Sequence, residues 1–300
     1  MSNRFKPHLA LVTVQILFGI WPIFGKIVLR SMSPTSLVAC RLVGAALAFT
    51  ILQRRITPLL RMPMKDILML VACSMLGIVG NQFIFVKGLS LTTVINVEIL
   101  GTTIPVYALA VSILLGYERG SVKTLLGVLL SAAGVLYLIN PLHADLTRQT
   151  TTGNVLILIN SLLYALYLVA SKDLVERYGA LNVVTWIFLV GSLITVPVGI
   201  YSLQQENLSA ISSSVWLAVA FIIIFPTVVA YYLNAWALTR VPPSLVAVYI
   251  YLQPLMAFGL APLLLGEKWS GRTIVAAVMI FGGVALVTRD HDQRIHPTVT

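Results

Sequence analysis

Two stretches of the chain resemble each other: SILLGYERGSVKTLLGVLLSAAGVLYLI over residues 112–139 and LLLGEKWSGRTIVAAVMIFGGVALV over residues 263–287. A shift of 149 residues, as from Pro105 to Pro254, aligns them, and the alignment extends from Leu89–Leu138 onto Leu238–Val287 without a gap. It also pairs Glu118 with Glu267 and Gly134 with Gly283. A fixed shift of this kind indicates that a whole structural unit is repeated.

The composition is too apolar for a water-soluble protein. Of the 300 residues, 58% are hydrophobic and 10% are charged, with a mean hydropathy of +0.95, whereas soluble domains carry about 25% charged residues. One compact core could not bury so much apolar surface. We therefore expect an all-α membrane protein that crosses the cell (inner) membrane many times.

Ten apolar runs come near the length of about 20 residues that a membrane-spanning helix needs. They lie near His8–Val28, Pro34–Leu52, Ile67–Gly88, Leu91–Leu115, Val122–Ile139, Gly153–Ser171, Leu181–Tyr201, Val215–Leu238, Pro243–Leu265 and Thr273–Thr288. Most connections are only a few residues long, and no segment has the composition of a soluble domain.

The net charge of +10 indicates orientation in the membrane rather than a nucleic-acid partner, because the basic residues lie in short loops between apolar runs. With the N-terminus inside, thirteen Lys and Arg residues fall in cytoplasmic segments. Four fall outside, namely Arg30, Arg148, Lys268 and Arg272. This excess predicts that both termini are cytoplasmic.

A second shift, of 146 residues from Lys26 to Lys172, places ILFGIWPIFGK over the end of NSLLYALYLVASK. Residues 1–140 and 141–300 then form two halves of five helices each. Because the number of crossings per half is odd, the halves must insert in opposite orientations. Such inverted repeats are typical of secondary transporters, whose substrate site lies between the halves near the membrane midplane.

The repeated stretches, together with LFGIWPIFGK (residues 17–26) and SPTSLVACRLVGAALAF (residues 33–49), resemble the EamA family of the drug/metabolite transporter superfamily. The resemblance covers nearly the whole chain and occurs in both halves. It implies ten spans and transport by alternating access, commonly the export of amino acids or other small metabolites. It also implies a cavity formed mostly by the first four helices of each half.

One acid stands in a long uncharged stretch. Glu98 has no charged neighbour in sequence between Lys87 and Glu118, and a carboxylate at membrane depth costs on the order of a few kcal/mol unless it meets water, a cation or a proton. Its repeat partner is Ala247, so the scaffold does not require an acid there. We hypothesise that Glu98 is a cation or proton site in a central cavity. The competing interpretations are a structural glutamate, paired with Lys87, Arg41 or a polar helix, and a position near the outer mouth.

Two prolines predict where the cavity lies. Pro105 shares a helix face with Glu98, and Pro254 shares the matching face with Tyr251. Each proline deprives a carbonyl one turn earlier of its hydrogen bond, and such carbonyls are tolerated at membrane depth where they line a cavity. The freed carbonyls belong to Gly101 and Ile250. Pro22 predicts a kink in the first span, which is either a hinge or a static bend.

The remaining candidates are aromatic and amide side chains. Trp21 aligns with Tyr167, and Gln82 aligns with Tyr231. Tyr and Trp suit stacking and cation–π contacts with a substrate, but both are also common at membrane interfaces. Arg41 is interpreted as an internal hydrogen-bonding residue. The candidate substrate-binding residues are Glu98, Trp21, Gln82, Tyr164, Tyr167, Tyr231 and Tyr251, a set that suits a zwitterionic, cationic or aromatic small molecule.

The sequence has no HExxH, GxSxG or GxxxxGK[ST] motif, so we expect no enzyme activity, cofactor, metal site or ATP-driven transport. Two classes of function remain. The first is a secondary transporter with a small-molecule substrate, surrounded by membrane lipid; its variant is a proton-coupled multidrug or cation antiporter centred on Glu98. The second is a membrane protein that serves assembly or interaction rather than transport.

Overall fold

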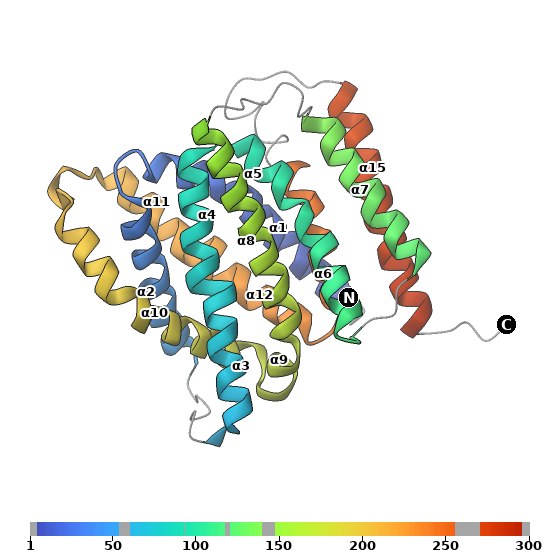
Figure 1. Cartoon of the computed structure of the whole chain (residues 1–300), viewed down its shortest axis with the longest axis horizontal. Coiled ribbons are helices and arrows are strands. Elements are labelled where there is room, and N and C mark those ends of the chain that lie inside the picture. The colour runs from blue at the N-terminus through green and yellow to red at the C-terminus, as the bar shows by residue number, and fades with distance from the viewer. Residues whose placement is uncertain are drawn as a thin grey trace.

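The computed structural model describes residues 5–53, 61–92, 94–117, 121–139, 148–255 and 271–295, and the regular elements in these ranges are helical (Figure 1). Three shorter apolar helices are Val122–Gly134, Pro243–Leu255 and Ile274–Val287. Among the described residues, seven helical stretches are long and apolar enough to cross a membrane: Phe5–Val28, Pro34–Leu52, Met64–Leu91, Asn96–Leu114, Thr150–Tyr178, Ala180–Gln204 and Ser213–Leu238. These ten stretches overlap the predicted runs, while the number of crossings and their orientation stay predictions.

The described residues of the first half form seven α-helices, several of which are parts of one longer rod. Ser33 caps the second of them, because its side chain accepts a hydrogen bond from the Ser36 N–H while Pro34 occupies the first turn. Gly116, at a φ of 75°, lies just beyond the sixth, where glycine commonly ends a helix. The helices are α1 (Phe5–Val28), α2 (Pro34–Leu52), α3 (Met64–Ser74), α4 (Gly80–Leu91), α5 (Val94–Gly101), α6 (Thr103–Leu114) and α7 (Val122–Ile139).

The second half follows the same pattern of long and interrupted helices. Gly179, at a φ of 81°, makes the sharp turn between the short ninth helix and the long tenth one. Residues 256–270, which include the start of the second repeated stretch, lie outside the described residues. The helices are α8 (Arg148–Ala170), α9 (Lys172–Tyr178), α10 (Ala180–Gln204), α11 (Ser213–Ile223), α12 (Ala230–Leu238), α13 (Pro243–Val248) and α15 (Gly271–Ile295).

Two π-helical segments interrupt the rods at matching positions of the repeat. The segment η2 (Met75–Val79) joins α3 to α4, and η5 (Ile224–Val229) joins α11 to α12. They begin 149 residues apart, at Met75 and Ile224, which is the shift that aligns the repeats. Pro226 lies within η5 and accounts for its geometry, since proline cannot donate the regular α-helical hydrogen bond. The segment η2 contains no proline, so no residue within it marks the interruption in the sequence.

The fourth and ninth predicted runs are also interrupted. The fourth is two helices rather than one, because α5 ends at Gly101 and α6 begins at Thr103. In the ninth, α13 passes into the 3-10 segment η6 (Tyr249–Leu252). Each interruption lies within about one turn before a proline, Pro105 or Pro254, as expected where proline cannot bond to the carbonyl four residues earlier.

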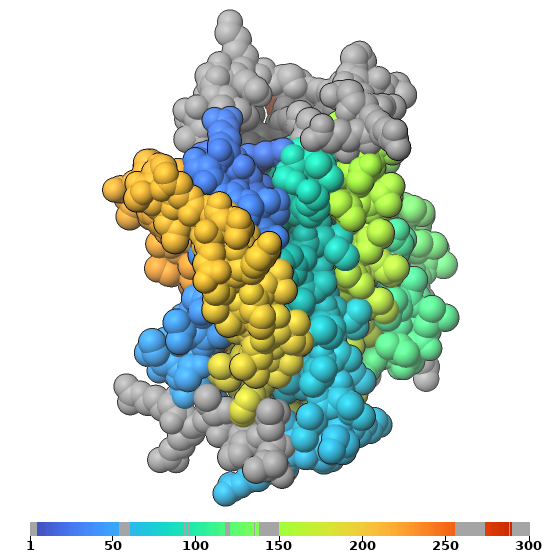
Figure 2. Space-filling model, turned by 60° about the vertical axis from the view of Figure 1, so that its left-hand side comes forward, coloured from blue at the N-terminus to red at the C-terminus, as the bar shows by residue number. Residues whose placement is uncertain are grey.

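Long helices flank a central group that contains α1. The rod α10 packs against α2 on one side, whereas α7 and α15 pair on the opposite side (Figure 1). Figure 2 shows the outer face of α10 beside α3 and α4. Between these flanks α1 contacts α4, α11, α12 and η6. This arrangement brings helices from both halves of the chain around α1.

Small residues let α7 and α15 approach each other closely. The Ser131 hydroxyl donates to the carbonyl oxygen of Ile280, which is 149 residues further along the chain, at 3.3 Å. A Cβ on Gly283 would collide with the Ser131 hydroxyl and with the carbonyl oxygen of Gly127. Such seams of small residues replace the hydrophobic effect as a source of helix packing in lipid.

Replacing Gly283 with alanine should therefore destabilise the protein by about 1–3 kcal/mol, because the added methyl group meets backbone that cannot move away. The measurement is the melting temperature of the detergent-solubilised protein. Gly282→Ala is the matched control, since a Cβ there meets only Leu130, at 3.7 Å. Equal melting temperatures for the two variants would contradict the close packing of α7 on α15.

Candidate functional site

A cavity of about 80 Å³ lies among α1, α2, α4, α5, α6, α8, α12 and η6. This volume holds several water molecules, but it is smaller than the roughly 300 Å³ and more of most ligand pockets. The polar residues that line it are Arg41, Asn81, Gln82, Glu98, Asn160, Tyr164, Tyr231 and Gln253. Phe18, Trp21 and Phe85 contribute aromatic surface. The site is therefore a narrow chamber whose wall combines polar and aromatic side chains.

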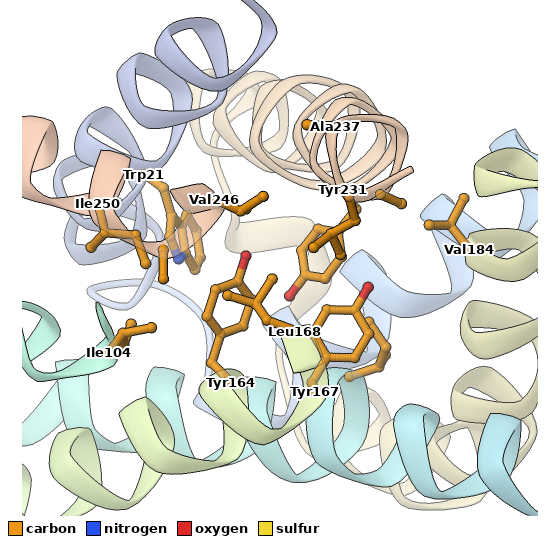
Figure 3. Close-up of a cluster of buried hydrophobic side chains, with 14 of the residues drawn as sticks. Trp21, Ile104, Tyr164, Tyr167, Leu168, Val184, Tyr231, Ala237, Val246 and Ile250 are labelled. Carbon is orange, nitrogen blue, oxygen red and sulfur yellow. The ribbon is translucent and has the colours of Figure 1, made fainter. Parts of the chain in front are cut away.

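Five of the seven candidate substrate-binding residues line this chamber: Glu98, Trp21, Gln82, Tyr164 and Tyr231. Tyr167 lies behind it, where its ring contacts those of Tyr164 and Tyr231 at centroid distances of 5.9 and 6.4 Å. Figure 3 shows Tyr164 and Tyr167 extending from α8 toward Tyr231 on α12. Tyr251 is fully buried in η6 and does not line the cavity either. A role for each residue in binding stays a prediction.

The prolines lie close to the cavity, but only one of them lines it. Pro22 contributes to the cavity wall from within α1, which continues through it as a helix. Pro105 and Pro254 are buried outside the lining. Gly101 and Ile250, the residues whose carbonyls were predicted to be freed, do line it, but the Ile250 carbonyl accepts a hydrogen bond from the Gln253 backbone N–H and is not free. The interrupted helices therefore meet at the chamber, although hinge motion stays a prediction.

Glu98 faces the chamber without a counterion. It is 5% exposed, and its Oε2 atom has no hydrogen-bond partner in the described part of the chain. The three ion pairs among the described residues do not include it. The competing interpretation of a glutamate paired with Lys87 or Arg41 is therefore not what the structure shows.

Arg41 is the residue of the site that sequence reasoning undervalued. It is 1% exposed and lines the cavity. Its Nε and Nη2 atoms donate to the Thr227 hydroxyl at 3.1 and 3.0 Å, and Nη1 donates to the Gln82 side-chain oxygen. These bonds agree with an internal hydrogen-bonding role. A charged residue within an apolar run was the sequence feature that singled out Glu98, and Arg41 has the same feature.

Hydrogen bonds between the two halves hold this group of side chains in place. The Gln82 amide nitrogen donates to the Tyr231 hydroxyl at 2.6 Å, and that hydroxyl donates to the Gly77 carbonyl in η2 at 3.3 Å. On the α8 side, Asn81 and Asn160 each donate an amide hydrogen to the other's backbone carbonyl, at 3.4 and 2.9 Å. The cavity wall is thus cross-linked between α4 and both α8 and α12.

Removing the Tyr231 hydroxyl should cost about 1–3 kcal/mol, because Tyr231→Phe leaves the buried Gln82 amide with one donor unsatisfied. The matched control is Tyr251→Phe, since the buried Tyr251 hydroxyl has no partner among the described residues. Thermal unfolding in detergent should show a lower midpoint for the first variant and an unchanged or higher one for the second. The reverse order would contradict the hydrogen-bond network.

Comparison with known proteins assigns a family to this arrangement. The sequence matches the EamA-like transporter family over residues 5–140 and again over residues 151–289. Among curated proteins, an uncharacterized transporter of Archaeoglobus fulgidus is 26% identical over 292 residues, which is 96% of this chain and 99% of that protein. The uncharacterized transporter YetK of Bacillus subtilis is 28% identical over 223 residues, which is 73% of this chain and 67% of that protein.

More distant similarities also extend over most of the chain. A WAT1-related protein of Arabidopsis thaliana is 22% identical, with 93% of this chain and 83% of that protein covered. A crystal structure superposes with a TM-score of 0.78 at 20% identity and covers 97% of this chain and 98% of its own. The helical architecture, the chamber and the two family matches together identify this multi-pass membrane protein as a member of the EamA-like transporter family.

Proposed function

We propose that this protein is a secondary transporter of the cell (inner) membrane that exports amino acids or related small metabolites by alternating access through the central chamber. The observation that carries the proposal is that unpaired Glu98 and side chains from both halves of the chain line one cavity. A polar chamber of this kind at membrane depth serves solute passage, whereas an assembly subunit has no use for it.

Contacts between repeat-equivalent residues support an inverted repeat as the basis of this mechanism. Gln82 bonds to Tyr231, and the Ser131 hydroxyl bonds to the Ile280 carbonyl; each pair is related by the shift of 149 residues. Residues on a two-fold axis touch their own symmetry mates, so these contacts support the proposal of such an axis between residues 1–140 and 141–300. The substrate site of inverted-repeat transporters lies on that axis.

The interrupted helices supply places where the two halves can move. The π segments η2 and η5 directly precede α4 and α12, which carry Gln82 and Tyr231. The breaks before Pro105 and Pro254 adjoin lining residues Gly101 and Ile250. Irregular backbone at membrane depth is tolerated where it lines a cavity, and it gives each half a joint at the substrate site. The narrow chamber then corresponds to one conformation in the alternating-access transport cycle.

The position of Glu98 favours a second candidate, in which transport is coupled to a proton or another cation. A buried carboxylate without a counterion must take up a cation from the chamber or bind a proton there. An antiporter for drugs or organic cations would use the same residue. In both versions Glu98 exchanges its cation as the chamber opens alternately to the two sides of the membrane.

Counterflow in proteoliposomes tests transport itself. Protein-dependent exchange of a labelled amino acid or small metabolite is the expected result, whereas a complete lack of exchange across such solutes would contradict the proposed function.

Glu98→Gln should abolish accumulation driven by a pH gradient, because the amide cannot bind the coupling proton. Glu176→Gln is the control, since Glu176 is an exposed acid paired with Lys172 on α9. Unaltered flux with the same pH profile in Glu98→Gln would reject the coupling role.

A further inference from the structure

The guanidinium of Arg41 is a buried positive charge with no ion-pair partner among the described residues. Its hydrogen-bond acceptors, the Thr227 hydroxyl and the Gln82 amide oxygen, are both neutral. Within the described ranges the ion pairs do not include Arg41, although Glu98 lines the same cavity. A buried cation is costly unless an anion compensates it. Arg41 and Glu98 therefore line one cavity as opposite charges that do not pair directly, so the guanidinium is left without an anionic group in contact with it.

The hydrogen bonds of Arg41 leave it able to bind such a group. A guanidinium has five N–H groups, and the bonds to Thr227 and Gln82 account for three of them. One N–H on each terminal nitrogen remains. Because Arg41 lines the chamber, these donors are within reach of a small molecule that enters it.

The surroundings of Arg41 fix its position before any solute arrives. Its Cζ atom lies 4.0 Å from the centroid of the Trp21 ring, so the guanidinium rests on an aromatic face. Gln82 presents its oxygen to Arg41 because its nitrogen is held by Tyr231. A donor held in place by such supports loses little entropy on binding an anion. Structural stability alone does not explain a supported cation that faces a chamber.

We propose that Arg41 binds the carboxylate of the transported solute, an assignment that rests on the proposed function. Guanidinium and carboxylate form strong paired hydrogen bonds. Glu98 in the same chamber then receives the solute's cationic group, so the cavity selects a small zwitterion. A simple organic cation would leave Arg41 unneutralised, and this distinguishes the zwitterionic substrate from the cationic drugs of an antiporter.

Matched ligand pairs test the assignment on the wild-type protein, without reliance on a variant that fails to fold. The probes are the standard amino acids, each compared with its C-terminal amide at a pH where both keep the ammonium group. Calorimetric titration of the purified full chain in detergent should show binding of at least one free acid, and weaker binding of its amide by on the order of 100-fold. Failure of every acid to bind, or equal affinity for acid and amide, would overturn the assignment.

Two variants of Arg41 test whether this residue causes the preference for the free acid over the amide. Arg41→Gln should remove the preference for acid over amide, and Arg41→Lys should recover it only in part, because lysine lacks the planar pair of donors. Arg240→Gln is the matched control: Arg240 also stacks on a tryptophan, with its Cζ 3.8 Å from the Trp236 ring centroid, but does not line the chamber. An unchanged preference in a folded Arg41→Gln protein would overturn the assignment.

Proteoliposome exchange of the same pairs separates this assignment from the proposed function. Exchange of acids but not of amides supports both. Exchange of amides as fast as of acids leaves transport standing and overturns the role of Arg41. Binding of acids that depends on Arg41, with no exchange of any solute, leaves Arg41 as a carboxylate site and overturns transport.

Discussion

Hydrocarbon offers no hydrogen bonds, so a polar group that this chain places at membrane depth has to find its partner within the protein or in a hydrated chamber. The described helices meet this constraint with short-range hydroxyl bonds. Thr102 donates to the Ile99 carbonyl and Thr103 to the Leu100 carbonyl, each at 2.7 Å, beside the break before Pro105. In η5 the Thr227 hydroxyl donates to the Ile222 carbonyl at 2.7 Å and also accepts from Arg41. Irregular backbone and buried charge thus share the same supporting residues.

The scaffold is repeated, but its chemistry is not. The π segments recur at matching positions of the two halves, and so do the prolines that follow the helix breaks. Both charged residues that line the chamber, Arg41 and Glu98, belong to the first half, whereas the second contributes neutral groups such as Tyr231 and Gln253. Glu98 is matched by Ala247, so symmetry maintains the fold and departures from it create a polar site.

Hydropathy was sufficient to predict the helical class, and the resemblance of the repeated stretches indicated the family, because both depend on residue type and spacing. The orientation of individual side chains needed more. Tyr251 was placed by counting 3.6 residues per turn, but it lies in η6, where 3-10 geometry winds about 3.0 residues per turn. Tyr251 is not among the residues that line the cavity, whereas its neighbour Ile250 is. Arg41 lies in an apolar run like Glu98, but the sequence alone did not show that its side chain faces the same chamber.

The π segments carry a consequence for how such chains change over time. Each one accommodates an extra residue relative to a regular helix, which rotates everything after it by about 100° around the axis. Gln82 and Tyr231 owe their meeting to this rotation, since each follows a π segment within its own rod. Deletion of a single residue from either segment would therefore rotate all the chamber-lining side chains that follow it in that rod toward lipid. A point substitution, in contrast, alters one side chain. Insertions and deletions should be much rarer there than in the loops.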